Sequence, residues 1–283
     1  MAALNGPVYV PAPNPVVPRY GLFSAATGPL DLPAHARQGG LQYELSTCAL
    51  PLGYTVACIE SHAAKAVSGS VGTVTATPFV VYSSINCSPV GLANWGQERV
   101  QQLLYQQLVA GEQSTVERLF SESTFGLSPG LGGATPAAVN LGNVGGIVRA
   151  FGTLESWLYA RYGIPGVIHV PMLAASYVKG AHLVEQDSPV SPWRTAPKSV
   201  VSFGNYAGTG PTGQVPAAGD TWIYITGQVA VWRTPDSELF VPSMGQIINR
   251  STNVLNIVME REYVVSYDCY IAAVQVTLTN TDT

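Results

Sequence analysis

Two glycine-rich stretches have the spacing of known catalytic or binding loops. Residues 208–213 read GTGPTG and match G-x-G-x-x-G, a spacing that in dinucleotide-binding proteins presents helix amides to a pyrophosphate. Here Pro211 lies inside the motif, and the sequence QVPAAGDTWIYI that follows predicts a strand as the next ordered element. Because no helix can begin there, we expect a wide loop between two strands rather than a nucleotide site.

The second stretch, GLSPG at residues 126–130, matches the G-x-S-x-G elbow that exposes a nucleophilic serine in hydrolases. In such an elbow the residue after the serine donates its backbone N–H to the oxyanion. Here that residue is Pro129, which has no N–H, and the flanking segments resemble a helix and a glycine loop. The sequence therefore argues against a small α/β hydrolase.

The titratable residues form no recognisable catalytic or metal-binding pattern. No histidine lies in H-E-x-x-H or in any close pair; the set is His35, His62, His169 and His182. His169 lies in the predicted buried strand GVIHV, so we expect a core histidine held by a hydrogen bond, with a catalytic base as the alternative. Asp220 and Asp236 are predicted to be turn or cap groups. We expect no catalytic residue, no cofactor site and no metal site.

Four cysteines, Cys48, Cys58, Cys87 and Cys269, lie far apart in the sequence without a C-x-x-C pair. This spacing predicts neither a zinc site nor a disulfide framework. We interpret the four as buried free thiols in a reducing cytoplasm.

The chain is poor in charge for its 283 residues. Charged residues make up 11%, against about 25% in a typical soluble protein, and the mean hydropathy is +0.20. No run reaches the roughly 18 apolar residues that a membrane-spanning helix needs. Composition therefore favours a surface that faces other subunits, with a weakly charged monomeric enzyme as the alternative. The net charge of −4 argues against a protein that binds by neutralising phosphates.

The sequence of the first 85 residues predicts segments that can bury little apolar surface within their own subunit. Five prolines fall within the first twenty residues, which favours an extended arm over residues 1–40, either disordered or laid across a neighbour. The arm's start has no basic region and does not resemble a secretion signal. Residues 41–85 predict strands and hairpins, including LQYEL, YTVACIE and a polar projecting hairpin at SGSVGTVTAT.

A long helix is predicted over residues 89–121, with Ser88 as cap and Pro89 at its first position. Its apolar period slips near Gly111, which predicts either a bend or a second helix capped by Ser114 with Glu117. A second apolar stripe runs from Val144 through Val148 to Leu158 and ends at Gly163. The strand GVIHV, a short helix from Pro171 to Gly180, and several strands complete the chain.

The order of these parts resembles the major capsid proteins of tailed double-stranded-DNA bacteriophages, which share the Hong Kong 97 shell fold, an α+β fold. The stretch SVVSFGNYAGTGPTGQVPAAGDTWIYITGQVAVWR resembles the loop and strand pair of their axial domain, and REYVVSYDCYIAAVQVTL resembles their closing strands. ARQGGLQYELSTC is similar to the end of their N-terminal arm, and TLESWLYARYGIPGVIHVP to their axial-domain helix and strand. The likeness is greatest to capsid proteins of phages that infect actinobacteria.

The resemblance implies a division of the chain into five parts. These are an N-terminal arm at 1–40, an extended loop region at 41–85, a peripheral domain with the spine helix at 86–135, an axial domain at 136–234, and the peripheral return strands at 235–283. Some members of the family crosslink Lys to Asn between subunits. Only Lys65 lies in the loop region here and nothing marks an acceptor, so no crosslink is predicted.

The resemblance also implies the function. The chain would be a non-enzymatic capsid protein that assembles with copies of itself into the pentamers and hexamers of an icosahedral head. It would enclose double-stranded DNA without sequence-specific binding. A scaffolding protein, a portal and a decoration protein are the expected partners, no membrane is involved, and the virion, assembled in the bacterial host cytoplasm, is the expected location.

Other readings stay open. One is an encapsulin-like compartment or a minor head protein. Another is a β-rich phage accessory binding protein, for which Trp222, Tyr224 and Trp232 would be the exposed aromatic cluster. Their spacing along strands predicts instead that these rings pack between layers.

Overall fold

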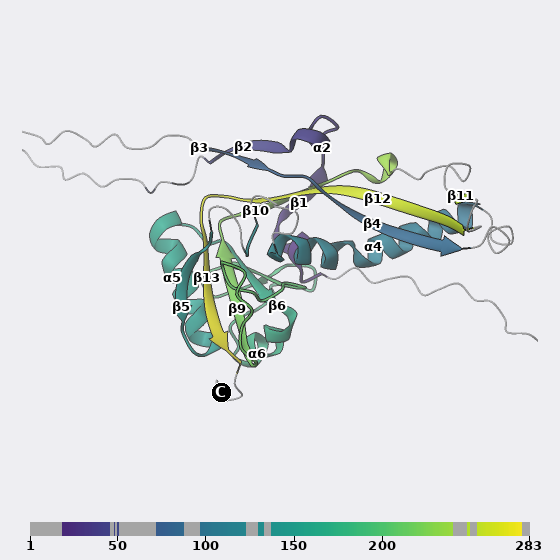
Figure 1. Ribbon diagram of the computed structural model, residues 1–283. Helices are drawn as coiled ribbons and strands as arrows, with labels where there is room; N and C mark the ends of the chain where they lie inside the picture. The colour runs from purple at the N-terminus through teal and green to yellow at the C-terminus, as the bar shows by residue number, and fades with distance from the viewer. Residues whose placement is uncertain are drawn as a thin grey trace, which may run out of the picture.

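The computed structural model describes residues 19–45, 48, 50, 72–87, 97–122, 130–132, 137–239, 248–249 and 254–278. Figure 1 shows two parts: an elongated one in which β4 and β12 run beside the long helix α4, and a compact one in which helices cover a second sheet. Strands follow one another in runs rather than alternating regularly with helices, as expected for an α+β fold.

The first sheet has five strands in the order β1-β10-β12-β11, with β4 also paired to β12. β4 and β12 form its longest ribbon, antiparallel from Leu255 opposite Cys87 to Tyr263 opposite Phe79. The strand bounds are β1 Thr27–Asp31, β4 Phe79–Cys87, β10 Val229–Arg233, β11 Ile248–Asn249 and β12 Val254–Tyr267.

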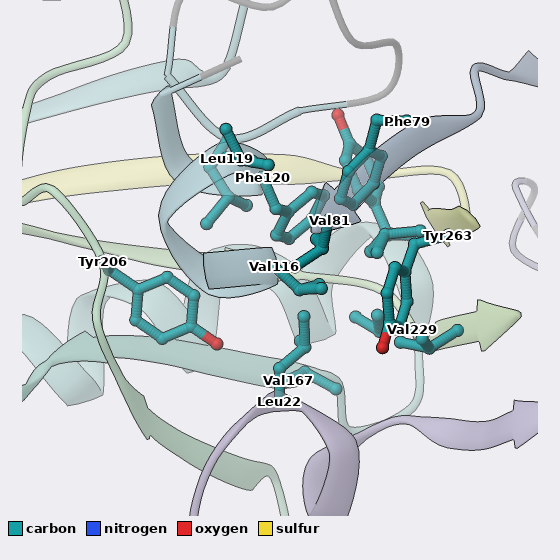
Figure 2. Packing of buried hydrophobic residues seen from close by; sticks show 14 of the residues in the cluster. Leu22, Phe79, Val81, Val116, Leu119, Phe120, Val167, Tyr206, Val229 and Tyr263 are labelled. Carbon is teal, nitrogen blue, oxygen red and sulfur yellow. The ribbon is translucent and has the colours of Figure 1, made fainter. Parts of the chain in front are cut away.

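Helix α4 (Gln97–Glu122) packs its apolar face on this ribbon and confirms the predicted long helix. Figure 2 shows Val116 and Phe120 close to Val81 and Tyr263 in the core. The helix runs unbroken through Gly111, so the alternative of a second helix capped by Ser114 and Glu117 is wrong. The predicted start at residues 88–89 lies outside the described residues.

The second sheet has six strands in the order β5-β13-β9-β6-β8-β7. Strand β6 (Val167–Pro171), the predicted GVIHV strand, is buried throughout. The other bounds are β5 Val139–Asn143, β7 Trp193–Arg194, β8 Val200–Gly204, β9 Asp220–Thr226 and β13 Ile271–Thr277.

Helix α5 (Ile147–Tyr162) covers this sheet with its buried residues, among them Ile147, Phe151, Leu154 and Leu158. It ends as predicted at Gly163, whose φ of +74° is the left-handed conformation that favours glycine. Val148 is 50% exposed, so its predicted place in the buried stripe is wrong. The predicted helix after Pro171 is a 3₁₀ turn, η2 (Met172–Ala174), followed by α6 (Ala175–Gly180).

Residues 19–40 pack on their own chain, so the expectation of an arm without contacts of its own is wrong for this part. They form α1 (Leu22–Ala25), β1 and α2 (Ala36–Gly39). Leu22 is fully buried in the core, the Phe203 N–H donates to the Tyr20 carbonyl at 2.8 Å, and β1 pairs in parallel with β10. Buried Leu22, a second buried pair at Leu32 and Ala36, and an added edge strand hold the segment, and no apolar period in the sequence predicts these contacts. Residues 1–18 lie outside the described residues.

After the arm, β2 (Leu41–Leu45) pairs antiparallel with β3 (Gly72–Ala76), from Leu41 opposite Ala76 to Leu45 opposite Gly72. The predicted strand LQYEL is confirmed as β2, and β3 takes the GTVTA part of the predicted polar hairpin. The predicted strand YTVACIE lies outside the described residues.

The chain passes from one sheet to the other through two connections, which lie side by side. β9 passes to β10 through Gly227 and Gln228, and β12 passes to β13 through residues 268–270. The Gly227 N–H donates to the Tyr270 carbonyl at 3.0 Å, and the Asp268 N–H donates to the Gln228 carbonyl at 2.9 Å. As a result β10, from the predicted axial domain at 136–234, lies in the first sheet, and β13, from the predicted return strands at 235–283, lies in the second. The five-part division stays a prediction.

Candidate functional site

The GTGPTG stretch is a loop between strands, as predicted. It lies between β8 and β9, and residues 205–219, all described, contain no helix. A Cβ at position 210 would lie 2.8 Å from the Trp222 indole, and Gly213 closes a turn at φ +79° by donating its N–H to the Gly210 carbonyl. The glycines therefore serve a tight turn packed on a ring. In the serine motif GLSPG only Gly130 is described, so the predicted absence of an elbow is untested.

His169 is a core histidine held by hydrogen bonds, as predicted. Its side chain is fully buried, with Nδ1 3.2 Å from the Tyr206 hydroxyl and Nε2 3.0 Å from Thr226 Oγ1. Burial lowers the pKa of His169 to about 3, so the ring is neutral near pH 7. Both ring nitrogens are occupied by partners within the core, which removes the geometric basis for the catalytic-base alternative.

Glu117 joins three parts of the fold through one carboxylate. Its Oε1 accepts the Leu22 N–H of the arm at 2.9 Å, and its Oε2 accepts the Asn205 N–H at 2.8 Å, just after β8. The side chain is nearly fully buried, which raises the pKa of Glu117, and hydrogen bonds from Leu22, Asn205 and Gln113 partly oppose that rise. Expected at most to cap a helix, Glu117 instead anchors the arm and the second sheet to α4.

Glu112, one helical turn before Val116, is the centre of a buried ion cluster. Its two carboxylate oxygens accept Arg233 Nη1 at 2.8 Å and Arg261 Nη1 at 2.5 Å, and the Tyr263 hydroxyl also donates to it. Arg261 has a fully buried side chain and also pairs with Asp236. Asp236 opens a 3₁₀ turn, η3 (Asp236–Glu238), as predicted, and its carboxylate has the further role of binding a cation from β12.

Sequence reasoning missed this cluster, although one signal was present. Glu112 falls in the series Leu104, Leu108, Val116 and Phe120, which repeats every four residues along the buried face of α4. A carboxylate in such a stripe must find a cation or hydrogen-bond donors. The partner Arg261 lies 149 residues away, so the sequence could indicate the need but not the partner.

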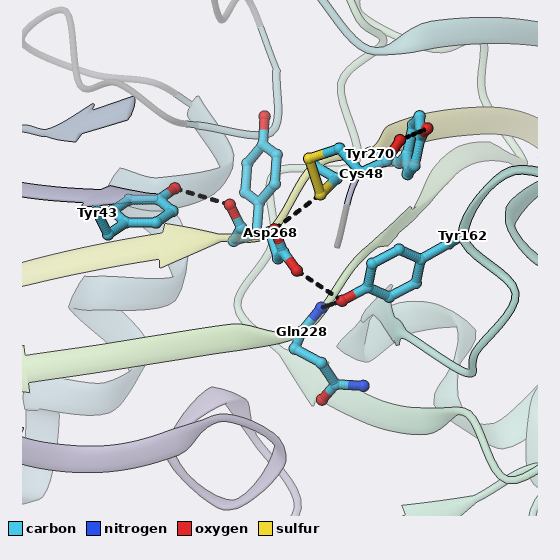
Figure 3. The surroundings of a disulfide bond; sticks show 8 residues. Tyr43, Cys48, Tyr162, Gln228, Asp268 and Tyr270 are labelled. Carbon is cyan, nitrogen blue, oxygen red and sulfur yellow. Dashed lines mark hydrogen bonds between the residues drawn. A yellow bond between two sulfur atoms is a disulfide. The ribbon is translucent and has the colours of Figure 1, made fainter. Parts of the chain in front are cut away.

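The turn between β12 and β13 carries a disulfide between Cys48 and Cys269, which are 221 residues apart (Figure 3). The structure bonds these two cysteines to each other, so the expectation that the spacing gives no disulfide is wrong for this pair. The fold brings the end of β2 to the turn at 268–270, where the chain passes from one sheet to the other. Of the other two, Cys58 and the side chain of Cys87 lie outside the described residues.

Hydrogen bonds surround the disulfide. The Tyr43 hydroxyl donates to the Tyr267 carbonyl at 2.7 Å, the Tyr270 hydroxyl donates to the Cys48 carbonyl, and the Tyr162 hydroxyl donates to Asp268 Oδ2 at 2.9 Å. Asp268 and the two sulfurs have ligand atoms within 4.8 Å of one another. With the sulfurs bonded to each other, neither is a thiolate that could bind a metal ion.

The aromatic candidates for a binding surface lie inside the fold. Trp222 and Tyr224 are 5% and 3% exposed, and Trp232 packs half-buried against the small cluster around Val264. The predicted packing between layers is confirmed for Trp222 and Tyr224. Within the described ranges, no helix has both the length and the apolar character needed to cross a bilayer.

Comparison with solved structures shows the fold. The chain is similar to the capsid protein of the native GTA particle, with a TM-score of 0.60 at 10% identity over 98% of this chain and 96% of that chain. A protein of Mycobacterium phage Bobi gives 0.56 at 12% identity over 98% and 97%. The SrpI encapsulin of Synechococcus elongatus gives 0.56 at 13% identity over 98% and 94%. No protein-family model and no curated protein matches the sequence.

These likenesses extend over nearly the whole of each chain, so they confirm the predicted shell fold from arm to closing strands. At 10% to 13% identity they show the fold alone. The encapsulin shares that fold as well, so the fold by itself does not separate a phage head from a bacterial compartment.

Proposed function

We propose that this chain is the major capsid protein of a tailed double-stranded-DNA phage, and that it assembles into the pentamers and hexamers of an icosahedral head. The observation that carries the proposal is the match to the capsid of the native GTA particle over 98% of this chain and 96% of that one. The sequence likeness to capsid proteins of actinobacterial phages supports the choice of a phage as the source.

The surface supports a chain that binds copies of itself. Large apolar side chains are well exposed on a protein with only 11% charged residues: Tyr82 65%, Tyr159 67%, Leu173 68%, Val190 71% and Val215 84%. A groove of about 410 Å³ lies beside Tyr159 and is lined by Ile164 and Pro197, among others. Contact between subunits would remove such surface from water.

Further parts of the proposal follow from the shell fold. The five-part division, from the arm at 1–40 to the return strands at 235–283, would place the second sheet around the capsomer axes. Scaffolding, portal and decoration proteins would be the partners, and the head would assemble in the host cytoplasm. The role is structural rather than catalytic. Because the chain has a net charge of −4, the shell would enclose packed DNA without binding it tightly.

The test is the size of the particles that the purified chain forms, alone and with a scaffolding protein where one is needed. Gradient sedimentation followed by electron microscopy should show rings, sheets or closed shells. A chain that stays monomeric under all conditions would contradict the proposal. The same samples should bind duplex DNA weakly. Strong, salt-sensitive binding would contradict a shell that encloses DNA without binding it tightly.

The second candidate is an encapsulin-like compartment, favoured by the match to the SrpI encapsulin with a TM-score of 0.56. Antibody labelling of particles from a native lysate separates the two. A phage coat should label tailed heads that protect DNA from nuclease. A compartment should label tailless particles that contain protein and no protected DNA.

A further inference from the structure

We propose that Cys48 and Cys269 form an oxidation site that is open in a reducing cytoplasm and closes when the chain meets an oxidant outside the cell. Closing it would fix the chain just after the end of β2 to the turn at 268–270, where β12 of the first sheet passes to β13 of the second. The timing rests on the proposed function, which places assembly in the host cytoplasm, where thiols are kept reduced. The chemistry itself depends only on this chain.

The fold holds the two cysteines at bonding distance. Cys48 lies three residues after the end of β2, and Cys269 is the middle residue of the turn between β12 and β13. Their Cα atoms are 5.2 Å apart, within the range that a disulfide spans without movement of the backbone. The pair can therefore open and close while the surrounding strands stay in place.

Contacts other than the sulfur–sulfur bond keep Cys48 at this position. The Tyr270 hydroxyl donates to the Cys48 carbonyl, and the Tyr43 hydroxyl of β2 donates to the Tyr267 carbonyl at 2.7 Å. Leu50 packs close to Gly163 at the end of α5. None of these contacts needs an oxidised pair, so the reduced chain would present two adjacent thiols.

Asp268 gives the pair a preference for the reduced form. Its Oδ1 lies 2.8 Å from Cys269 Sγ, and its Oδ2 accepts the Tyr162 hydroxyl (Figure 3). A Cys269 thiol can donate its S–H to Oδ1, whereas a disulfide sulfur has no proton to donate. The carboxylate also disfavours the thiolate that must form before exchange. Asp268 should therefore slow closure, while its hydrogen bond with the Cys269 S–H stabilises the reduced pair.

The oxidation balances with a low-molecular-weight disulfide such as oxidised glutathione. One protein thiolate attacks a sulfur of oxidised glutathione, which releases one glutathione thiolate and leaves a mixed disulfide. The second protein thiolate attacks the protein sulfur of that mixed disulfide, forms the Cys48–Cys269 bond and releases the second glutathione. Two protein thiols lose two protons and two electrons, and one oxidised glutathione becomes two thiols. Both cysteines are half-buried, so a small oxidant can approach them.

Closing the pair would join three parts of the fold covalently. The ribbon contributes Cys48, and the turn at 268–270 belongs to both sheets through β12 and β13. The neighbouring Gly227 N–H and Gln228 carbonyl hydrogen-bond to the same turn. A bond here would hold Cys48 against the body of the subunit and would oppose unfolding of both sheets at once.

The first test follows the bond itself. Intact expressing cells are quenched with acid and an alkylating agent, and the purified chain, in whatever oligomeric state it adopts, is treated with oxidised glutathione before the same quench. Trypsin releases Cys48 within residues 38–65 and Cys269 within 262–283, and mass spectrometry without reduction detects the linked pair. Cys48→Ser should abolish the linked peptides, whereas Cys58→Ser, in the same tryptic peptide, should keep them.

The expected result is alkylated thiols in cells and linked peptides after oxidation. Linked peptides already present in cells, or none after oxidation, would overturn the proposal, and so would cysteines protected from alkylation by a bound thiophilic metal ion. Because the measurement reads a covalent bond in any oligomeric state, it can succeed or fail independently of shell formation.

The second test separates the role of Asp268 from a general effect on folding. Asp268→Asn removes the charge and keeps an oxygen for Tyr162, so closure by oxidised glutathione should accelerate about threefold to tenfold. Tyr162→Phe, the matched control, keeps the charge and should not accelerate closure. Equal rates for Asp268→Asn and the wild type would overturn the role given to the carboxylate.

Discussion

Glu117 Oε1 accepts the backbone N–H of Leu22, a residue 95 positions earlier in the chain, at 2.9 Å. The other oxygen of the same carboxylate accepts the N–H of Asn205. The arm and the second sheet are thus attached to the long helix by one buried side chain. A Cβ at Gly21 would lie 2.3 Å from Oε1, and one at Gly204 would lie 2.5 Å from Cδ, so both backbone segments approach as closely as only glycine permits.

Removal of this carboxylate should loosen both attachments. Glu117→Ala leaves the Leu22 and Asn205 N–H groups buried without an acceptor, each of which costs about 1–3 kcal/mol. We expect the free energy of unfolding, measured with urea, to fall by at least about 2 kcal/mol. The exposed Glu44 of β2 is the control, since Glu44→Ala should change it by no more than about 0.5 kcal/mol. Equal effects of the two variants would contradict the anchoring role.

The pH dependence of Glu117 follows from its raised pKa, of which burial is the largest cause. The folded chain binds this proton more tightly than the unfolded chain, so the stabilisation is full below the ordinary glutamate pKa and is lost as the pH rises through the folded value. Relative to Glu117→Gln, the wild type should lose stability as the pH rises from about 4.5. Urea unfolding of both proteins at several pH values checks this, and a wild type that gains stability over the window would contradict it.

The contribution of His169 to stability should change with pH in the direction opposite to that of Glu117. Burial lowers its pKa from 6.5 to about 3, so between these values the unfolded chain binds more protons than the folded chain. Stability should therefore fall as the pH drops from 6.5 towards 3, by a few kcal/mol. His169→Gln should remove most of this acid sensitivity, and His35→Gln, which changes an exposed histidine, should keep it. If His169→Gln retained the full acid sensitivity, a neutral buried ring could not be its cause.

Local patterns in the sequence predicted the elements that fold by local rules. The apolar stripes of α4 and α5, the Gly163 cap and the GVIHV strand all depend on spacing within one element. The features that the sequence analysis missed depend on residues that lie far apart in the chain. Residues 220–233 form two strands in two sheets, and the chain changes sheet at Gly227, where a Cβ would lie 2.1 Å from the Asp268 carbonyl oxygen.

The candidate sites show the same contrast between features set by neighbouring residues and features set by residues far apart in the chain. The loop character of GTGPTG and the core role of His169 followed from flanking residues. The partners of Glu112, Glu117 and Cys48 lie roughly 90 to 220 residues away, and no spacing rule specifies them. Only the carboxylate in the buried stripe of α4 signalled that some partner must exist.

The buried pair of Arg261 and Glu112 should be far more sensitive than the exposed pairs. Arg261→Leu leaves Glu112 buried with one cation fewer, and such a loss costs about 3–5 kcal/mol. The double variant Arg261→Leu with Glu112→Leu should recover part of that loss. Lys198→Met breaks a half-exposed pair with Glu185 and should cost no more than about 1 kcal/mol. Chemical unfolding of the wild type, Arg261→Leu, Glu112→Leu, the double variant and Lys198→Met tests this, and additive effects of the two single changes at 261 and 112 would contradict a coupled cluster.

Two glycines within reach of α4 should respond to alanine in opposite ways. Gly111 lies inside the unbroken helix, and a Cβ there meets nothing within 4 Å, so Gly111→Ala should stabilise the chain by about 0.5–1 kcal/mol. Gly204→Ala places a Cβ 2.5 Å from the Glu117 carboxyl carbon and must displace the side chain that anchors the arm. We expect a lower melting temperature for Gly204→Ala and a higher one for Gly111→Ala. A bend at Gly111 that alanine could not adopt would reverse the sign of the first change, and a tolerated Gly204→Ala would show that Glu117 can move without loss of its hydrogen bonds.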